Sequence, residues 1–333
     1  MQVHNKIIEQ IKSGIIAPFY LLSGTEPYFI DSISKSIVDK LTSESSRDFD
    51  FSILYGKDTS VKEIIETAKR YPMISEHHLI LIREAQYLEK KYDEFSKYLL
   101  NPQKQSVVVF CFKNKIFDKR SKFYKNAASS GVVYESKPLY ENQISGWIYS
   151  QLKNENLNVS PKSIQLLIEY LGSDLGKIKQ EIIKLKISCS NKLITPELIE
   201  RYVGISKDYN NFELINTIGS KKKNKTIQII YYLSNNSKSH PLVLTISSLF
   251  QFFKKLLLFH GIKGSNASIP SILGVNPYFI KDYEIASKFY NMKDCSQVID
   301  IIHKADLRSK GIIGNNESHK EILIDLINEI FNV

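Results

Sequence analysis

Short apolar runs and amphipathic stretches alternate from the start of the chain to about residue 138. The continuous apolar runs Phe19–Leu22, Leu79–Ile82 and Val107–Phe112 are typical of strands that are buried on both faces of a parallel sheet. Phe51–Tyr55 alternates in polarity, and Val132–Tyr134 is a further short run. Because helical patterns lie between the runs, the sequence predicts an α/β fold, with a mostly parallel sheet and helices on both faces.

Two of the intervening helices can be placed by their apolar faces, since positions that recur every three or four residues share one side of a helix. Ser60 and Glu63 match the capping box that begins a helix. The expected apolar faces are Ile30, Ile33, Ile37 and Leu41 in the first helix, and Val61, Ile64, Ile65 and Ala68 in the second.

Strand signals vanish after Pro138, and helical patterns continue to the end of the chain. Ser160-Pro161 and Thr195-Pro196 each combine an N-cap residue with a proline at the first helical position. The sequence therefore predicts an all-helical second part. Its later helices are expected at Phe212–Ile218, Thr226–Leu233, Leu242–Phe259, Pro277–Tyr290, Cys295–Leu307 and Glu317–Phe331.

Two changes of pattern divide the chain into three expected domains. The first is the loss of strand signals near Pro138, and the second is the polar, turn-rich stretch Gly204–Asn211. A chain of 333 residues is also too long for one ordinary core. We expect an α/β domain at residues 1–139, a small helical domain at 140–207 and a C-terminal helical domain at 208–333.

Composition restricts the class of protein. Hydrophobic residues make up 43% of the chain and charged residues 24%, as in globular proteins. The longest apolar runs are too short to cross a bilayer, and the N-terminus lacks the apolar core of a signal peptide, so we expect a cytoplasmic protein with no membrane contact. Cys111, Cys189 and Cys295 are widely spaced, which predicts buried free thiols and no metal site.

Basic residues outnumber acidic ones, with 45 Lys and Arg against 35 Asp and Glu and a formal net charge of +10. Such an excess favours a polyanionic partner, because basic side chains contact phosphates and release counterions. Charge alone does not distinguish a nucleic-acid-binding protein from a chain that is lysine-rich for other reasons.

The turn after the first strand is where an α/β nucleotide-binding protein places its phosphate-binding loop. Here the turn contains Gly24, Thr25 and Glu26, with one glycine, no lysine, and a carboxylate that repels phosphate. Arg83 follows the strand Leu79–Ile82, where an NTPase needs a magnesium-binding carboxylate. These residues fit two interpretations equally: an ATPase fold that has lost its ATP site, or an α/β fold that never bound a nucleotide. The sequence contains no other catalytic set and no cofactor motif.

Three stretches carry a resemblance to a known family. Phe19–Ile30 contains Gly-Thr-Glu-Pro-Tyr-Phe-Ile, Pro72–Ala85 joins a helix tip to a buried strand, and Asp118–Lys125 reads Asp-Lys-Arg-Ser-Lys-Phe-Tyr-Lys. They resemble the delta subunit family of the bacterial DNA polymerase III clamp loader, whose patterns include G-x-E-P-Y-L-I and D-K-R-x-K-x-Y-K. The resemblance spans nearly the whole chain in order, and it is the set of motifs that makes it specific. Weaker matches are Gly172–Leu175, Glu181–Leu185 and Ala305–Gly311.

The resemblance implies an AAA+-like α/β domain without a functional ATP site, a helical lid domain and an all-α collar domain. It implies a non-catalytic subunit of a DNA-directed DNA polymerase, which binds the sliding clamp and opens its ring for loading on primed DNA during replication. The implied partners are the sliding clamp, the ATP-hydrolysing clamp-loader subunits, the delta-prime subunit and primer–template DNA. No cofactor is implied.

By position, the resemblance implies that Met73 and Ile74 form the apolar wedge that the family inserts into a pocket of the clamp. Tyr71, Pro72 and His77 would flank this contact. The usual family pair is Leu-Phe or similar, so Met-Ile differs in identity but stays apolar. The residues alone favour another interpretation, because a loop between a helix and a strand often tucks a Met and an Ile into its own core.

A basic segment with interleaved aromatic residues follows the strand Val107–Phe112, at the edge of the sheet. We hypothesise that it contacts DNA phosphates or a neighbouring subunit, and the alternative is a solvated basic face with aromatic core anchors. Its basic residues are Lys113, Lys115, Lys119, Arg120, Lys122 and Lys125, and its aromatic residues are Phe117, Phe123 and Tyr124.

Two other functions stay open at the level of sequence. One is a degenerate P-loop NTPase that still hydrolyses nucleotide, which saturable ATP binding would indicate. The other is a nucleic-acid-binding scaffold unrelated to clamps, which failure to bind a clamp would indicate.

Overall fold

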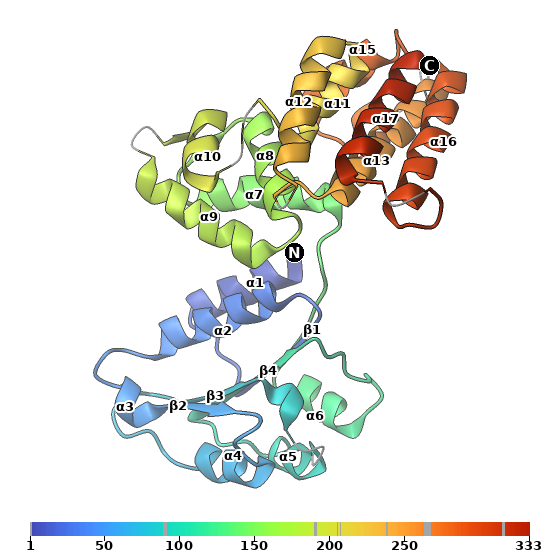
Figure 1. Cartoon of the computed structure of the whole chain (residues 1–333). Coiled ribbons are helices and arrows are strands. Elements are labelled where there is room, and N and C mark those ends of the chain that lie inside the picture. The colour runs from blue at the N-terminus through green and yellow to red at the C-terminus, as the bar shows by residue number, and fades with distance from the viewer. Residues whose placement is uncertain are drawn as a thin grey trace. The chain divides into compact units, whose positions relative to one another are not determined.

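The computed structural model describes residues 2–88, 92–189, 192–204, 206, 208–237, 239–262, 268–314 and 317–333 (Figure 1). The chain divides into two compact units, Met1–Leu139 and Tyr140–Val333. The first is an α/β unit and the second is almost entirely helical, which confirms the predicted fold class. A further division of the second unit near residue 207 stays a prediction, and the expected boundary stretch includes Ile205 and Lys207, which lie outside the described residues.

The α/β unit is built on a five-stranded parallel sheet in the order β2-β3-β4-β1-β5. All five expected strands are present. In register, Leu21 lies opposite Phe110 and Leu79 opposite Val107. The elements are α1 (Gln2–Lys12), β1 (Phe19–Gly24), α2 (Pro27–Leu41), α3 (Arg47–Asp50), β2 (Phe51–Tyr55), α4 (Val61–Ala68), β3 (His78–Arg83), η1 (Ala85–Tyr87), α5 (Tyr92–Tyr98), β4 (Ser106–Lys113), α6 (Lys122–Ser130) and β5 (Val132–Ser136).

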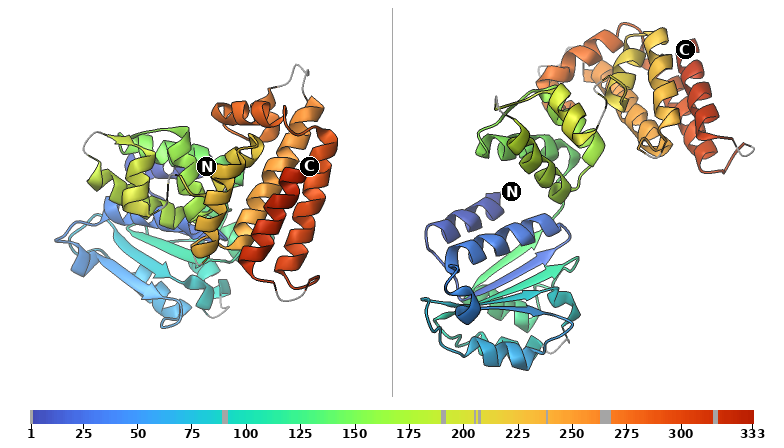
Figure 2. Two further views of the ribbon diagram at one scale, coloured as in Figure 1. Left: turned by 45° about the horizontal axis from the view of Figure 1, so that its top comes forward. Right: turned by 60° about the vertical axis from the view of Figure 1, so that its left-hand side comes forward.

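Helices cover both faces of this sheet, as expected. α1 and α2 lie on one face, and α4, α5 and α6 lie on the other (Figures 1 and 2). Under the second face Phe19, Phe95, Phe110 and Phe123 pack with ring centroids 4.7 to 6.4 Å apart. Aromatic pairs at such separations add to the stabilisation that comes from burial, so this cluster fixes the strands that carry the candidate site.

The helices predicted from apolar spacing bury the expected faces. Ile30, Ile33 and Ile37 of α2 are all 0% exposed. At the start of α4 the Ser60 hydroxyl accepts a hydrogen bond from the N–H of Glu63, at 3.2 Å. The expected capping box is only half formed, because the Glu63 carboxylate accepts a hydrogen bond from the neighbouring hydroxyl of Thr59, at 2.8 Å.

The second unit corrects one expectation, because it contains a short parallel pair of strands. A two-residue strand is too short to show a period, so the sequence pattern could not reveal it. The expected N-caps Ser160 and Thr195 are confirmed. The elements are α7 (Glu141–Asn154), β6 (Asn158–Val159), α8 (Pro161–Leu171), α9 (Leu175–Ser188), β7 (Leu193–Ile194), α10 (Pro196–Val203), α11 (Asn211–Gly219), α12 (Lys223–Asn235), α13 (Leu242–Ile262), α14 (Ile269–Leu273), η2 (Pro277–Phe279), α15 (Ile280–Ala286), α16 (Met292–Ser309) and α17 (His319–Asn332).

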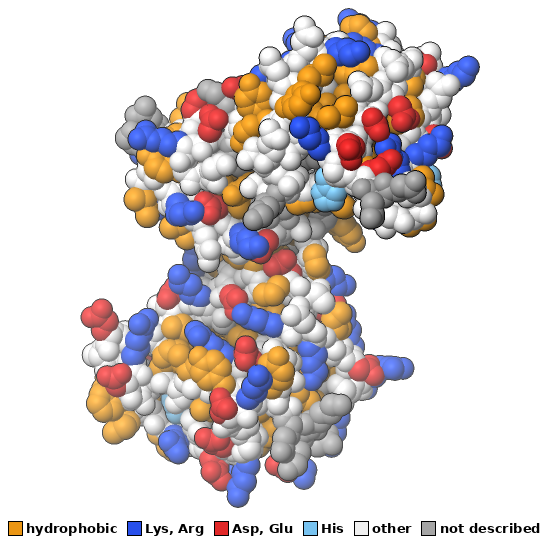
Figure 3. All heavy atoms as spheres, in the orientation of Figure 1, with side chains coloured by type: hydrophobic (Ala, Val, Ile, Leu, Met, Phe, Trp, Pro, Cys, Tyr) orange, Lys and Arg blue, Asp and Glu red, His pale blue; other side chains and the backbone are white. Residues whose placement is uncertain are grey.

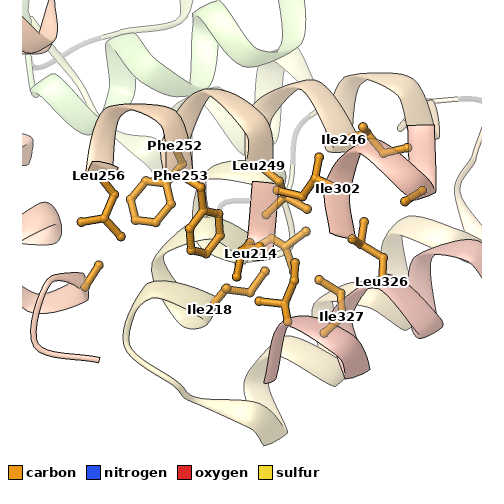
Figure 4. Close-up of a cluster of buried hydrophobic side chains, with 14 of the residues drawn as sticks. Leu214, Ile218, Ile246, Leu249, Phe252, Phe253, Leu256, Ile302, Leu326 and Ile327 are labelled. Atoms are coloured by element: carbon orange, nitrogen blue, oxygen red, sulfur yellow. The ribbon is translucent and has the colours of Figure 1, made fainter. Parts of the chain in front are cut away.

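The core of the C-terminal helices forms around α13 (Figure 4). Its residues Leu249, Phe253 and Leu256 are each 0% exposed and pack with Leu214 of α11 and Leu326 of α17. By length and composition α13 could also cross a membrane. The central helix of a globular core passes the same test, and the buried side chains of α13, from Leu242 to Phe259, form the centre of such a core here.

Two further expectations differ locally. The helix expected at Pro277–Tyr290 is divided into η2 and α15. α15 ends at Ala286, and Asn291 caps the next helix, α16. Cys111 and Cys295 are buried free thiols, as expected. Cys189 is only partly buried, since it directly follows the last residue of α9.

Candidate functional site

The loop between α4 and β3, residues 69–77 (the α4–β3 loop), presents apolar side chains to solvent. Tyr71, Met73 and Ile74 are 70%, 76% and 57% exposed, while Pro72 and His77 are partly buried. The interpretation that Met73 and Ile74 are tucked into their own core is therefore wrong. Pro72 disfavours a helical conformation at Tyr71, so the helix cannot easily continue from α4 into the loop.

The backbone under these side chains is held by a carboxylate from another segment. Asp50, at the end of α3, accepts hydrogen bonds from three successive N–H groups: Met73 at 2.5 Å, Ile74 at 2.8 Å and Ser75 at 2.5 Å. Asp50 itself is 2% exposed. The site thus consists of a buried charge below and apolar side chains above. Sequence reasoning missed Asp50, because its partners lie more than twenty residues further along the chain.

The protonation states at this loop follow from burial and hydrogen bonding. Burial would raise the pKa of Asp50, but the N–H groups of Met73, Ser75 and Ile74 outweigh it and hold the pKa below its usual value. Burial lowers the pKa of His78, against the opposing effect of the Asp50 charge. Near neutral pH the loop therefore rests on a carboxylate, with a neutral imidazole beside it.

The turn that would bind phosphate in an ATPase is filled by the protein itself. Gly24 has a φ of +132°, and a Cβ at this position would lie 2.0 Å from the carbonyl oxygen of Ser136. That carbonyl accepts a hydrogen bond from the N–H of Thr25, at 3.1 Å. Glu26 caps α2, accepting from the N–H of Tyr28 at 3.0 Å. A carboxylate thus occupies the helix N-terminus where a phosphate would sit.

The basic segment begins directly beside this turn. The N–H of Asn114 donates to the carbonyl of Gly24, at 2.8 Å, so the structure brings residues 113–115 and 24–26 together. The position is not at a lateral edge of the sheet as expected, because β4 is the central strand. The segment instead lies at the carboxyl ends of the parallel strands.

Four of the six basic residues proposed to contact DNA have partners within the chain. Three of them form ion pairs, and the fourth, Lys115, contacts aromatic rings. Lys113 pairs with Asp31 at 2.8 Å, Lys119 with Glu135 at 3.2 Å, and Arg120 with Asp118 at 3.1 Å. Lys122 and Lys125, in the first turns of α6, are exposed, and neither has an ion pair within the described part of the chain. Figure 3 shows basic and acidic side chains interspersed over the visible face of each unit.

Lys115 lies in an aromatic cage. Its Nζ is 5.0 Å from the ring centre of Tyr92, 5.1 Å from that of Phe112 and 5.0 Å from that of Phe117. The ammonium also donates to the Tyr92 hydroxyl at 3.1 Å. Cation–π contacts and a hydrogen bond hold this side chain in place.

No cluster of three or more His, Cys, Asp or Glu side chains that could hold a metal ion occurs among the described residues. The described residues combine an exposed apolar loop on a fixed backbone with a turn after β1 that is filled by the chain's own groups.

Two family models match the chain, in the order of its units. The model described as DNA polymerase III, delta subunit, matches residues 20–137, and that of the DNA polymerase III delta subunit, C-terminal domain, matches residues 208–326. Together they cover more than two thirds of the sequence. The chain belongs to the DNA polymerase III delta subunit family. This confirms the predicted family and makes the chain a subunit of DNA polymerase III. Binding to the sliding clamp and opening of its ring stay predictions.

Relatives of this delta chain match it over most of their length. The DNA polymerase III subunit delta of Bacillus subtilis (strain 168) is 23% identical over 329 residues, which cover 96% of this chain and 94% of that protein. The probable delta subunit of Aquifex aeolicus (strain VF5) is 21% identical over 308 residues, 87% of this chain and 85% of that protein. The solved structure of the Bacillus subtilis DNA clamp loader delta protein (YqeN) matches with a TM-score of 0.55 and 20% identity, over 99% of this chain and 100% of that one.

Proposed function

We propose that this chain binds the sliding clamp through Met73 and Ile74 and opens its ring for loading on primed DNA. The observation that carries the proposal is the exposure of these two side chains, 76% and 57%, on a loop whose backbone is held from below. Burying each in a pocket contributes roughly 1.5–3 kcal/mol, so the pair supplies about 3–6 kcal/mol before ordering costs.

Ring opening requires more than binding. A ligand shifts a conformational equilibrium only by the difference in its affinity for the two states. The two side chains therefore open the clamp to the extent that their pocket fits them better in the open or distorted ring. No bond-making step within this chain is needed for that work.

The remaining roles follow from the same assignment. The chain itself hydrolyses no ATP, and the ATP-hydrolysing loader subunits supply that step, because Glu26 and Ser136 fill the phosphate turn. Residues 1–139 bind the clamp, residues 140–207 act as a lid, and residues 208–333 join the collar with the other subunits, including delta-prime. The setting is the cytoplasm. Contact with primer–template DNA stays a prediction. Of the six basic residues predicted for it, Lys122 and Lys125 are exposed and have no ion pair in the described part of the chain.

The test is a variant with Met73→Ser and Ile74→Ser, measured for binding to the sliding clamp of the same organism by surface plasmon resonance. Losing about 3 kcal/mol of apolar burial raises Kd by about 100-fold. We expect the increase to appear mainly in the dissociation rate, as for most changes within an interface.

A matched control is a variant with Leu100→Ser and Ile116→Ser, since these side chains are 70% and 58% exposed in the same unit. It removes the same kind of exposed apolar surface elsewhere and should bind the clamp as the unmodified chain does. Equal affinity of the Met73/Ile74 variant and this control would refute the proposed clamp contact.

A further inference from the structure

Asp50 is a buried carboxylate whose hydrogen bonds all point to the loop that carries Met73 and Ile74. Its two oxygens accept from the N–H groups of Met73, Ile74 and Ser75, and the Ser75 side chain adds a further hydrogen bond. Among the described residues Asp50 has no ion pair. A charge that is 2% exposed without a cation is expensive to bury unless N–H donors surround it.

The geometry has a direct effect on the two exposed side chains. Residues 73–75 lie outside any helix or strand, between the end of α4 at Ala68 and the start of β3 at His78. A loop of this kind would ordinarily sample many backbone conformations. Three hydrogen bonds, all accepted by one rigidly placed carboxylate, restrict the loop to one backbone conformation, in which Met73 and Ile74 are directed outwards.

Placement of the carboxylate is secure, because Asp50 joins α3 directly to β2. Phe51, the next residue, pairs in register with Leu79 of β3, which is 0% exposed. The sheet thus determines where Asp50 lies, and Asp50 determines where the loop lies. The loop therefore loses its conformational entropy when the chain folds. Binding a partner then requires no further ordering of the loop, so the affinity is not reduced by it.

We propose that Asp50 is a positioning residue for clamp binding, which holds the backbone of Met73–Ser75 so that Met73 and Ile74 meet the clamp pre-organised. This inference rests on the proposed function. Asp50 does not touch the clamp and acts only through the two apolar side chains.

The first test needs no clamp. Amide hydrogen exchange at residues 73–75, followed by NMR, should be slow in the unmodified chain and at least about tenfold faster in Asp50→Asn, the factor that corresponds to about 1.4 kcal/mol. The amide of Asn keeps the shape of the side chain, but it loses the charge and turns one acceptor into a donor. Fast exchange of all three N–H groups in the unmodified chain would overturn the proposed role of Asp50.

The second test is a double-mutant cycle on clamp affinity, with Asp50→Asn, Met73→Ser/Ile74→Ser, and the three substitutions combined. Asp50→Asn alone should raise Kd about tenfold, equivalent to about 1.4 kcal/mol. In the chain that already lacks Met73 and Ile74, the same substitution should change Kd by less than about twofold, because there is nothing left to position. A general loss of folding would instead weaken binding equally in both backgrounds.

Asp31→Asn is the matched control, since Asp31 is a carboxylate of the same unit that pairs with Lys113 at 2.8 Å and makes no contact with the α4–β3 loop in the described structure. It should leave both exchange and affinity unchanged. If Met73→Ser/Ile74→Ser binds normally, the proposed clamp contact itself fails. If that variant loses binding while Asp50→Asn has no effect or a purely additive one, only the role of Asp50 fails.

Discussion

At the scale of single residues, the turn after β1 shows how a few groups of the chain itself prevent phosphate binding at the place where an α/β ATPase would bind it. Glu26 supplies the N-cap of α2 with its own carboxylate, and Pro27 at the first helical position has no N–H to offer a phosphate. The backbone of Ser136 occupies the space beside Gly24. An incoming triphosphate would have to displace both groups and would find no lysine in the turn.

We therefore expect the isolated chain to show no saturable ATP binding below about 1 mM, the concentration that corresponds to about 4.1 kcal/mol of binding free energy. Isothermal titration calorimetry with magnesium and ATP is the measurement. Glu26→Gln should behave in the same way, because removing the charge leaves the turn without a lysine. Saturation at micromolar ATP would favour a working, if unusual, nucleotide site.

The residues that sequence reasoning missed share one property, which is that their partners are distant in the sequence. Asp50 reads locally as one more acidic residue in Asp48-Phe49-Asp50-Phe51. In the sequence Lys115 is one of several basic residues in a row. Its contact with Tyr92 exists only in the folded chain. No local pattern signals the burial of Asp50, because β2, the strand that follows it, lies at the edge of the sheet and is itself only partly buried.

At the scale of elements, α8 and α11 meet through a titratable group. The carboxylate of Glu169 in α8 accepts hydrogen bonds from the N–H groups of Asn211 and Phe212, the first two residues of α11. Burial raises the pKa of Glu169 to about 7, against the lowering effect of the two N–H donors, and the charge of Glu213 raises it further. The protonation state of one side chain thus influences a contact between two helices.

A carboxyl group whose pKa is raised by folding stabilises the folded state when protonated, and this contribution is lost as pH rises through the folded pKa. The free energy of unfolding should therefore fall between pH 5 and pH 8, by at most about 3 kcal/mol at 1.36 kcal/mol per pKa unit. Urea unfolding followed by circular dichroism at several pH values measures it. Glu169→Gln should reduce the slope.

The control is Glu155→Gln, because hydrogen bonds from Lys186 and Lys179 lower the pKa of Glu155. Its contribution is present above the unfolded pKa and is lost only in more acidic solution, so the slope between pH 5 and pH 8 should stay as in the unmodified chain. Identical slopes for Glu169→Gln and the unmodified chain would count against the assignment.

Helices and strands could be predicted from the sequence where they are long enough for their apolar residues to show a repeat. The strands around Leu21, Leu81 and Val109 and the buried faces of α2 and α4 follow directly from apolar spacing. The two-residue strands β6 and β7 and the five-residue helix α14 are too short to show one. The order of strands in the sheet depends on contacts between segments far apart in the chain, which spacing does not encode.

At the scale of the whole molecule, each unit contains its own core. The hydrogen bonds of the five-stranded sheet all join strands within residues 19–136. The aromatic cluster around Phe110 lies in the same unit. The described residues of the cluster around α13 lie between Tyr209 and Val333. A domain of this size commonly folds alone, since it buries enough apolar surface to offset its conformational entropy.

We expect a fragment of residues 1–139 to fold without the remainder of the chain and to retain clamp binding, with a Kd within about threefold of the full chain, or about 0.7 kcal/mol. The sheet, Asp50 and the α4–β3 loop are all contained in it. Thermal unfolding by circular dichroism tests the folding, and surface plasmon resonance tests the affinity, with the fragment 140–333 as the control that should not bind. A folded first fragment that fails to bind, beside a second fragment that does, would place the clamp contact among the C-terminal helices and remove Met73 and Ile74 from it.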